Sequence, residues 1–107
     1  MQQNDLGWVE IGRATLVGPG EHTVYQSAHG PIIIVNIDHE FYALEDVCTH
    51  DGGLLSDGWI EEDALVCPRH GARFSIKTGE VLCPPAYEGI NTYPVKVVEG
   101  KLFVKIS

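Results

Sequence analysis

The stretch VCTHDGGLLSDG, residues 47–58, ends an apolar run with a cysteine and a histidine two positions apart and continues into a glycine-rich turn. A second stretch, LVCPRHGARF (65–74), repeats both residue types, with the histidine now three positions after the cysteine. A thiolate and an imidazole this close together at a turn can face a common point, so two such turns offer two sulfurs and two nitrogens to a metal. The candidate metal ligands are therefore Cys48, His50, Cys67 and His70.

This donor set is compatible with two kinds of centre. One is a structural zinc site, and the other is a [2Fe–2S] cluster in which two histidines replace two cysteines on one iron. Zinc fingers usually pair like ligands as C-x-x-C, whereas each turn here supplies one of each type. Mixed pairs suit a binuclear centre, because one iron can take both sulfurs and the other both nitrogens. The spacing favours the cluster and leaves a zinc-stabilised binding module open.

Composition bounds the class of protein. A length of 107 residues predicts one domain, residues 1–107. Seven Lys and Arg against fifteen Asp and Glu give a net charge of −8, which disfavours nucleic acid and anionic membranes as partners. The acidic charge is equally compatible with plain solubility and with steering toward a basic protein. Because the apolar runs are far shorter than the ~20 residues of a membrane span and no secretory signal is visible, we expect a cytoplasmic protein.

Segments rich in β-branched and aromatic residues recur along the chain, and no window keeps a helical period. This pattern predicts an all-β protein, a small antiparallel β-sandwich or barrel. Residues 31–37 and 41–47 are expected to form a hairpin. Further strands are expected at 22–28, 91–99 and 101–107.

Residues 46–86 differ from the rest and hold all three cysteines. They are interpreted as an inserted two-loop subdomain that binds the metal centre. Two hairpins are expected within it, turning at 61–63 and 77–80, with Gly79 supplying a positive φ. Three cysteines are an odd number and too few for a disulfide framework, so we expect reduced thiols or metal ligands.

The motif C-T-H at 48–50, followed after sixteen residues by C-P-x-H-G at 67–71, resembles the Rieske iron–sulfur signature. The similarity extends to F-x-x-x-T-G-E-V at 74–81 and to CPPA at 83–86. Nearly the whole chain is similar to the small Rieske ferredoxins that feed electrons to bacterial ring-hydroxylating dioxygenases. The resemblance implies a Rieske fold and one [2Fe–2S] cluster held by Cys48, His50, Cys67 and His70.

The same resemblance implies a function. The chain is expected to carry one electron at a time from a flavoprotein reductase to a terminal oxygenase, as a monomer, without catalysing a reaction itself. It also implies that both histidines bind through Nδ1 and leave Nε2 at the surface for electron exchange. An alternative is a small subunit of a larger reductase, similar to the Rieske-type component of assimilatory nitrite reductase. A complete Rieske oxygenase is excluded by size.

The chain departs from the Rieske subunits of respiratory complexes at two pairs of positions. Those relatives carry an extra, disulfide-linked cysteine in each ligand loop, where this chain has Gly53 and Arg69, so no disulfide is expected. They also place hydroxyl groups near the cluster sulfurs, where this chain has Ala72 and Phe74. Fewer donors leave the reduced cluster less stabilised. The predicted reduction potential is therefore low, about −150 mV.

Other residues have both a structural and a functional interpretation. Cys83 is not needed to complete the ligand set and is expected to be a small buried residue, and Trp59 is expected to pack in the core. The resemblance implies that Pro84 and Pro85 form a loop that shields the cluster. The glycines of the ligand turns are expected to serve backbone conformation: Gly52, Gly53 and Gly71. The remaining histidines are expected to be ordinary solvated residues: His22, His29 and His39.

Replacing His50 or His70 with cysteine tests why histidines are needed. With neutral imidazoles the oxidised site has no net charge, and a further thiolate would make it negative. Because adding an electron to a more negative site costs more Coulomb energy, either substitution should lower the reduction potential if the cluster still assembles. A redox titration of the two variants measures this, and an unchanged potential would contradict the charge argument.

Overall fold

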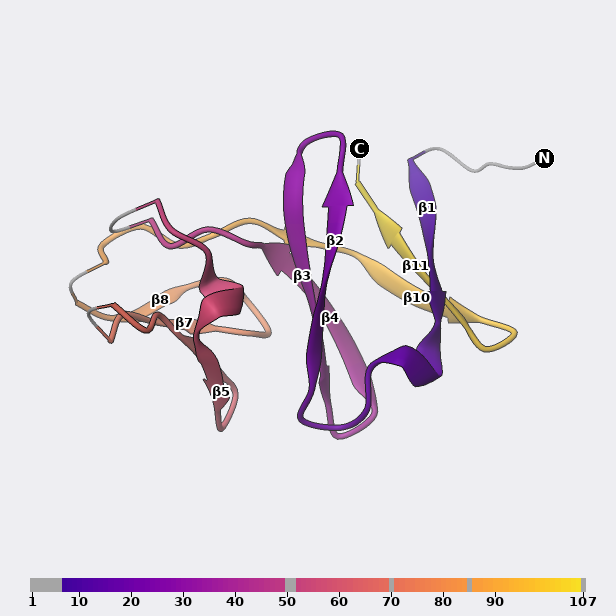
Figure 1. Cartoon of the computed structure of the whole chain (residues 1–107), viewed down its shortest axis with the longest axis horizontal. Coiled ribbons are helices and arrows are strands. Elements are labelled where there is room, and N and C mark those ends of the chain that lie inside the picture. Colours follow the sequence, from indigo (N-terminus) through magenta and orange to yellow (C-terminus); the bar gives the residue numbers. More distant parts are fainter. Residues whose placement is uncertain (1–6, 50–51, 70, 85, 107) are drawn as a thin grey trace.

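The computed structural model describes residues 7–49, 52–69, 71–84 and 86–106, which form three antiparallel sheets and two short 3-10 helices (Figure 1). The first sheet has the order β1-β11-β10, the second β2-β3-β4-β9 and the third β5-β6-β7-β8. The elements are β1 Trp8–Arg13, η1 Ala14–Leu16, β2 His22–Ser27, β3 Gly30–Ile37, β4 Glu40–Glu45, η2 Leu55–Asp57, β5 Trp59–Glu61, β6 Ala64–Val66, β7 Arg73–Ser75, β8 Val81–Cys83, β9 Thr92–Tyr93, β10 Val95–Val98 and β11 Lys101–Lys105.

The expected all-β fold is confirmed, and strand β3 lies at its centre. Successive side chains of a strand point to opposite faces, and both faces of β3 are buried. Ile32 and Ile34 pack with Leu102 and the other buried residues of the β1-β11-β10 side. Ile33 and Val35 pack instead in a second cluster of buried side chains, which includes residues of the third sheet. The unbroken apolar run of this strand therefore joins two cores.

The third sheet forms the inserted subdomain. Its inner face is one row of paired positions, Ile60, Leu65, Phe74 and Val81, one from each strand. These side chains belong to or pack against the same cluster as Ile33. The molecule is elongated, 44 × 26 × 19 Å, and the loops that leave the third sheet lie at one end of the long axis, opposite the β1-β11-β10 sheet (Figure 1).

The strand expected at 91–99 divides at Pro94. Thr92 and Tyr93 pair with β4 in the second sheet, whereas β10 begins at Val95 and pairs with β11 in the first. Proline has no backbone N–H to donate to a ladder, so it marks the point where the chain changes sheets. The two inserted hairpins and the 31–37 and 41–47 hairpin form as predicted.

The sequence did not indicate strand β1. Its pairing with β11 shifts register between Glu10 and Gly12, and this β-bulge interrupts the two-residue alternation on which strand prediction depends. The expectation that Trp59 packs in the core is wrong, because its side chain is 47% exposed. Trp59 starts the short edge strand β5 on the outer face of the third sheet, where its Nε1 donates to Glu61 Oε2 at 3.3 Å.

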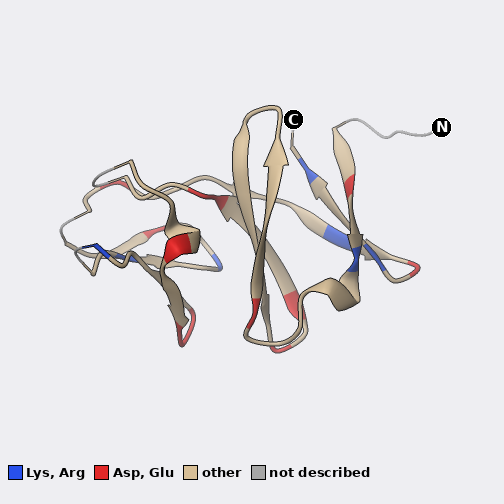
Figure 2. Cartoon of the chain, viewed as in Figure 1, with Lys and Arg blue, Asp and Glu red and all other residues tan. Residues whose placement is uncertain are grey.

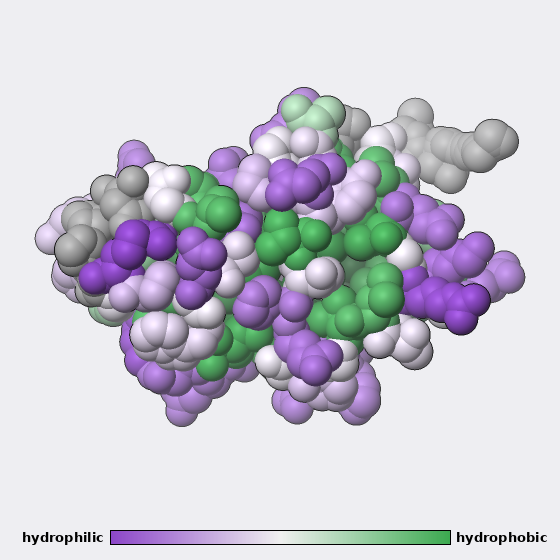
Figure 3. Space-filling view, in the orientation of Figure 1, coloured by the Kyte–Doolittle hydropathy of each residue, from purple (hydrophilic) through white to green (hydrophobic). Residues whose placement is uncertain are grey.

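The surface is mixed in character. On the face seen in Figure 3, hydrophobic residues gather along the middle of the molecule, and the ends are more polar. The described residues include no helix that is both long and apolar enough to cross a membrane.

Gly79 and Gly100 offer a matched test of how the third sheet is held. Both have φ +78, but a Cβ on Gly79 would lie 2.2 Å from the Ile90 carbonyl oxygen, whereas a Cβ on Gly100 would meet nothing within 4 Å. Gly100→Ala should cost about 1–2 kcal/mol for the left-handed conformation. Gly79→Ala should lower the free energy of unfolding by about 1–3 kcal/mol more, because backbone must move. Urea denaturation measures both, and equal losses would contradict the close approach.

Candidate metal centre

The first ligand loop, Cys48–Gly53, is closed by two backbone hydrogen bonds. The Cys48 N–H donates to the Gly53 carbonyl at 2.8 Å, and the Gly52 N–H donates to the Cys48 carbonyl at 2.7 Å. Gly52 has φ +77, a conformation that residues with a Cβ rarely adopt. The loop thus depends on glycine at its fifth position, as expected from the sequence.

The second ligand loop, Cys67–Ala72, repeats this geometry. The Cys67 N–H donates to the Ala72 carbonyl at 2.8 Å, and the Gly71 N–H donates to the Cys67 carbonyl at 3.0 Å. Gly71 has φ +77, the same value as Gly52. The two loops are therefore structural equivalents, each with its cysteine at the first position and glycine at the fifth.

The two cysteines at the start of the loops are fully buried. Cys48 and Cys67 each have 0% exposure and belong to one cluster of buried side chains, together with Leu55 and Phe74. No disulfide joins the three cysteines of the chain, all of which the structure describes. The fold therefore places two thiols in the same apolar region, on two equivalent loops.

His50 and His70 lie outside the described residues, as does Pro85, so their predicted roles stay predictions. The described residues beside both histidines are accessible. Gly71 and Arg69 are exposed, and Thr49 is half-buried. Each ligand loop thus runs from a buried cysteine to residues that reach the surface.

The segment Cys83–Glu88, which we call the proline loop, contacts both ligand loops. The Thr49 hydroxyl donates to the Glu88 carbonyl at 2.6 Å, and the Cys83 Sγ lies 3.6 Å from the Gly71 carbonyl oxygen. Cys83 was expected to be buried, but it is half-buried, because it lies at the end of the edge strand β8. This thiol therefore lies beside the second ligand loop.

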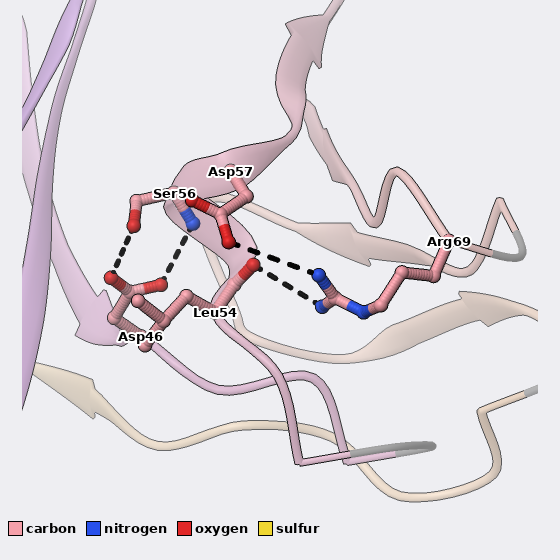
Figure 4. A network of polar contacts seen from close by, with 5 residues as sticks. All are labelled: Asp46, Leu54, Ser56, Asp57 and Arg69. Carbon is pink, nitrogen blue, oxygen red and sulfur yellow. Dashed lines mark hydrogen bonds and ion pairs between the residues drawn. The ribbon is translucent and has the colours of Figure 1, made fainter.

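A polar network that the sequence analysis missed surrounds η2 (Figure 4). Asp46 is only 2% exposed, and both of its carboxylate oxygens accept from Ser56, one from the backbone N–H at 2.8 Å and the other from the hydroxyl at 2.6 Å. On the other side, Arg69 Nη2 donates to the Leu54 carbonyl at 3.2 Å. In the sequence, the one feature that indicates this network is Asp46, a carboxylate in the apolar run before Cys48.

The donor chemistry of these loops fits a [2Fe–2S] cluster. Two buried thiols at equivalent loop positions can supply the sulfur ligands, and a histidine follows each within three residues. Ala72 and Phe74, the positions discussed for hydroxyl donors, are both 0% exposed and carry no hydroxyl. The residues present therefore fit the cluster, and the ligand set itself stays a prediction.

The chain matches a known family model. The model described as "Rieske [2Fe-2S] domain" matches residues 7–94. The 3-phenylpropionate/cinnamic acid dioxygenase ferredoxin subunit of Escherichia coli (strain K12) is 45% identical over 76 residues, which cover 70% of this chain and 72% of that protein. The corresponding subunit of Shigella flexneri gives the same identity and coverage.

Solved structures agree with the sequence matches. A chain in the complex of reduced oxygenase and oxidized ferredoxin in carbazole 1,9a-dioxygenase superposes with a TM-score of 0.88 and 29% identity, covering 94% of each chain. The Sphingomonas yanoikuyae B1 ferredoxin gives a TM-score of 0.86 with 29% identity, covering 92% of this chain and 98% of that one.

Ala72→Ser tests the argument about hydroxyl donors. Ala72 is fully buried, and its carbonyl accepts from the Cys67 N–H. A serine at this position would therefore place its hydroxyl group in the second ligand loop. A hydrogen bond from this hydroxyl to sulfur stabilises the more negative reduced state, so the reduction potential should rise. A redox titration of the variant beside wild type measures the shift. An unshifted potential would show that the hydroxyl does not reach sulfur.

Proposed function

The chain belongs to the Rieske [2Fe-2S] domain family, and on that premise we propose that it carries single electrons to a terminal oxygenase through a cluster held by Cys48, His50, Cys67 and His70. The family match confirms the expected [2Fe–2S] cofactor. The similar proteins are ferredoxin subunits, so this chain is an electron-transfer component and not a catalytic subunit. When bound, the cluster takes up and releases one electron reversibly.

The chain contributes the position of the ligands. Buried Cys48 and Cys67 hold the sulfur side inside the apolar core, away from water. Exposed Arg69 and Gly71 beside His70, and half-buried Thr49 beside His50, support the proposal that both imidazoles bind through Nδ1 and present Nε2 at the surface. These histidines would then provide the route by which an electron reaches a partner.

Charge supports a protein partner with a basic surface. The three Lys and Arg side chains of the described subdomain each lie in an ion pair with a carboxylate, as Arg69–Asp57, Arg73–Glu61 and Lys77–Asp63. Residues 46–86 hold seven Asp and Glu against three Lys and Arg, so the subdomain is acidic overall. Other Lys and Arg residues gather on the β1-β11-β10 sheet (Figure 2). An acidic subdomain attracts a complementary basic surface and speeds encounter.

The names of the relatives indicate the pathway in which the carrier works. One relative belongs to a dioxygenase of 3-phenylpropionate and cinnamic acid, and another is bound to the oxygenase of carbazole 1,9a-dioxygenase. We propose that the acceptor is a terminal oxygenase acting on an aromatic compound and that the donor is a flavoprotein reductase. The proposal includes a monomeric cytoplasmic protein, residues 1–107, whose cluster-binding insertion spans 46–86.

These matches favour the electron carrier over the two alternatives raised by the sequence. The relatives named above are ferredoxin subunits of dioxygenases, and the match covers 98% of the solved Sphingomonas yanoikuyae B1 ferredoxin. The matching family is described by its iron–sulfur cluster, which favours the cluster over a structural zinc ion.

Spectroscopy of the purified protein tests the cofactor and its ligands. Anaerobically prepared protein should be red-brown, contain two irons per chain and give, when reduced, the low average g-value of histidine-ligated clusters. His50→Ala and His70→Ala should each lose this signal, whereas His39→Ala, an exposed control, should retain it. Colourless protein with stoichiometric zinc after iron-replete expression would contradict the proposal.

Turnover tests the place of the chain in electron transfer. Mixed with the reductase and oxygenase components of 3-phenylpropionate dioxygenase, the holoprotein should support oxidation of the aromatic substrate, and the rate should fall as salt screens the acidic subdomain. Failure to be reduced by the flavoprotein reductase or to be reoxidised by the oxygenase would contradict the proposed donor and acceptor separately.

A further inference from the structure

We propose that Arg69 and η2 form a loop strut, made of Asp46, Leu54, Ser56 and Arg69, that fixes the two ligand loops relative to each other and so retains the cluster (Figure 4). This inference rests on the proposed function for the cluster itself. It assigns positioning roles to side chains that are not ligands.

One half of the loop strut closes the first ligand loop from outside. Asp46 precedes Cys48 by two residues, and Ser56 follows Gly53 by three. The carboxylate of Asp46 accepts both the backbone N–H and the hydroxyl of Ser56, at 2.8 and 2.6 Å. Hydrogen bonds to a charged acceptor are stronger than neutral ones, and here the acceptor is buried. The two ends of the first loop are thereby held together.

The other half reaches across to the second ligand loop. Arg69 lies between Cys67 and the second candidate histidine, yet its Nη2 donates to the carbonyl of Leu54, beyond the first loop. Its Nη1 lies 4.0 Å from Asp57 Oδ2. The guanidinium also rests on Gly53, since a Cβ there would lie 2.5 Å from Arg69 Cζ. One side chain of the second loop thus packs on the first loop and bonds to the residue that follows it.

The hydrogen bond and the packing carry the effect, not the ion pair. Asp57 and Arg69 are both solvent-accessible, with side chains 64% and 32% exposed, and exposed ion pairs of this kind contribute little. The bond to the Leu54 carbonyl has a fixed backbone acceptor, and the absent side chain at Gly53 leaves space for the guanidinium. The strut should therefore tolerate salt and loss of the Asp57 charge.

The consequence concerns retention of the cluster. A binuclear group that takes ligands from both loops is released when the loops separate, so a bridge between the loops opposes release. Removing a hydrogen bond from a charged donor should raise the rate of cluster loss about tenfold. Gly53→Ala should act in the same direction, because the added methyl displaces the guanidinium while leaving Arg69 in the chain.

The experiment compares Arg69→Met with Arg73→Met in holoprotein. Arg73 is a matched control, because its side chain is 34% exposed against 32% for Arg69 and it also has a carboxylate partner, but that partner is Glu61 within the third sheet. First-order loss of the visible absorbance with excess chelator gives the release rate. The EPR spectrum of the reduced protein reports ligand geometry, and amide hydrogen exchange over 48–56 and 67–72 reports loop opening with or without the cluster.

The loop strut predicts a distinct set of results. Arg69→Met and Gly53→Ala release the cluster about tenfold faster and exchange loop amides faster, Arg73→Met and Asp57→Asn stay near wild type, and Arg69→Lys lies between. The EPR g-values of Arg69→Met should shift, which a general loss of stability would not cause. Equal release and exchange in Arg69→Met and Arg73→Met would overturn the strut, whereas wild-type protein without an iron–sulfur spectrum would overturn the proposed cofactor and leave the exchange comparison to decide the strut.

Discussion

Burial of β3 on both faces is the constraint on which the rest of the structure depends. A strand with a single buried face could support the β1-β11-β10 sheet or the inserted subdomain, but not both. Because Ile32 and Ile34 face one core and Ile33 and Val35 the other, this strand joins them within one short run. Phe74 of the subdomain packs in the second core with Cys48 and Cys67, so the position of the thiols is set by the same hydrophobic contacts that set the fold.

The site is organised in two tiers. Apolar packing determines where each ligand loop starts, and the paired backbone bonds of each loop determine its shape. Neither tier fixes the distance between the loops, which are separated by η2, β5 and β6 in the chain. Polar contacts provide that information: Arg69 with Leu54 on one side, and the proline loop with Thr49 and Gly71 on the other. A small electron carrier can in this way keep two ligand loops together without a covalent link between them.

Local chemistry explains which features could be predicted from the sequence. The hairpins and the positive φ of Gly79 depend on residues close together in the chain, and both predictions agree with the structure. Strand β1 was missed because a bulge breaks its alternation, and Trp59 was placed in the core because edge exposure cannot be read from side-chain size. The contact between Arg69 and Leu54 joins residues fifteen positions apart, and no short pattern indicates it.

The pairing of β4 with β9, before the chain changes sheets at Pro94, has a consequence for how such a domain can vary. The chain enters the insertion from β4 and returns through β9, and these strands lie side by side, with Ala43 opposite Tyr93 and the Glu45 N–H bonded to the Asn91 carbonyl at 2.8 Å. The two ends of the insertion are therefore held together by the β4–β9 pairing. The loops of the subdomain can therefore lengthen, shorten or be exchanged while β4 and β9 stay paired. A longer loop between two strands that are already paired adds little further entropy cost. Changes confined to the inserted subdomain can thus alter which redox partner such a domain binds.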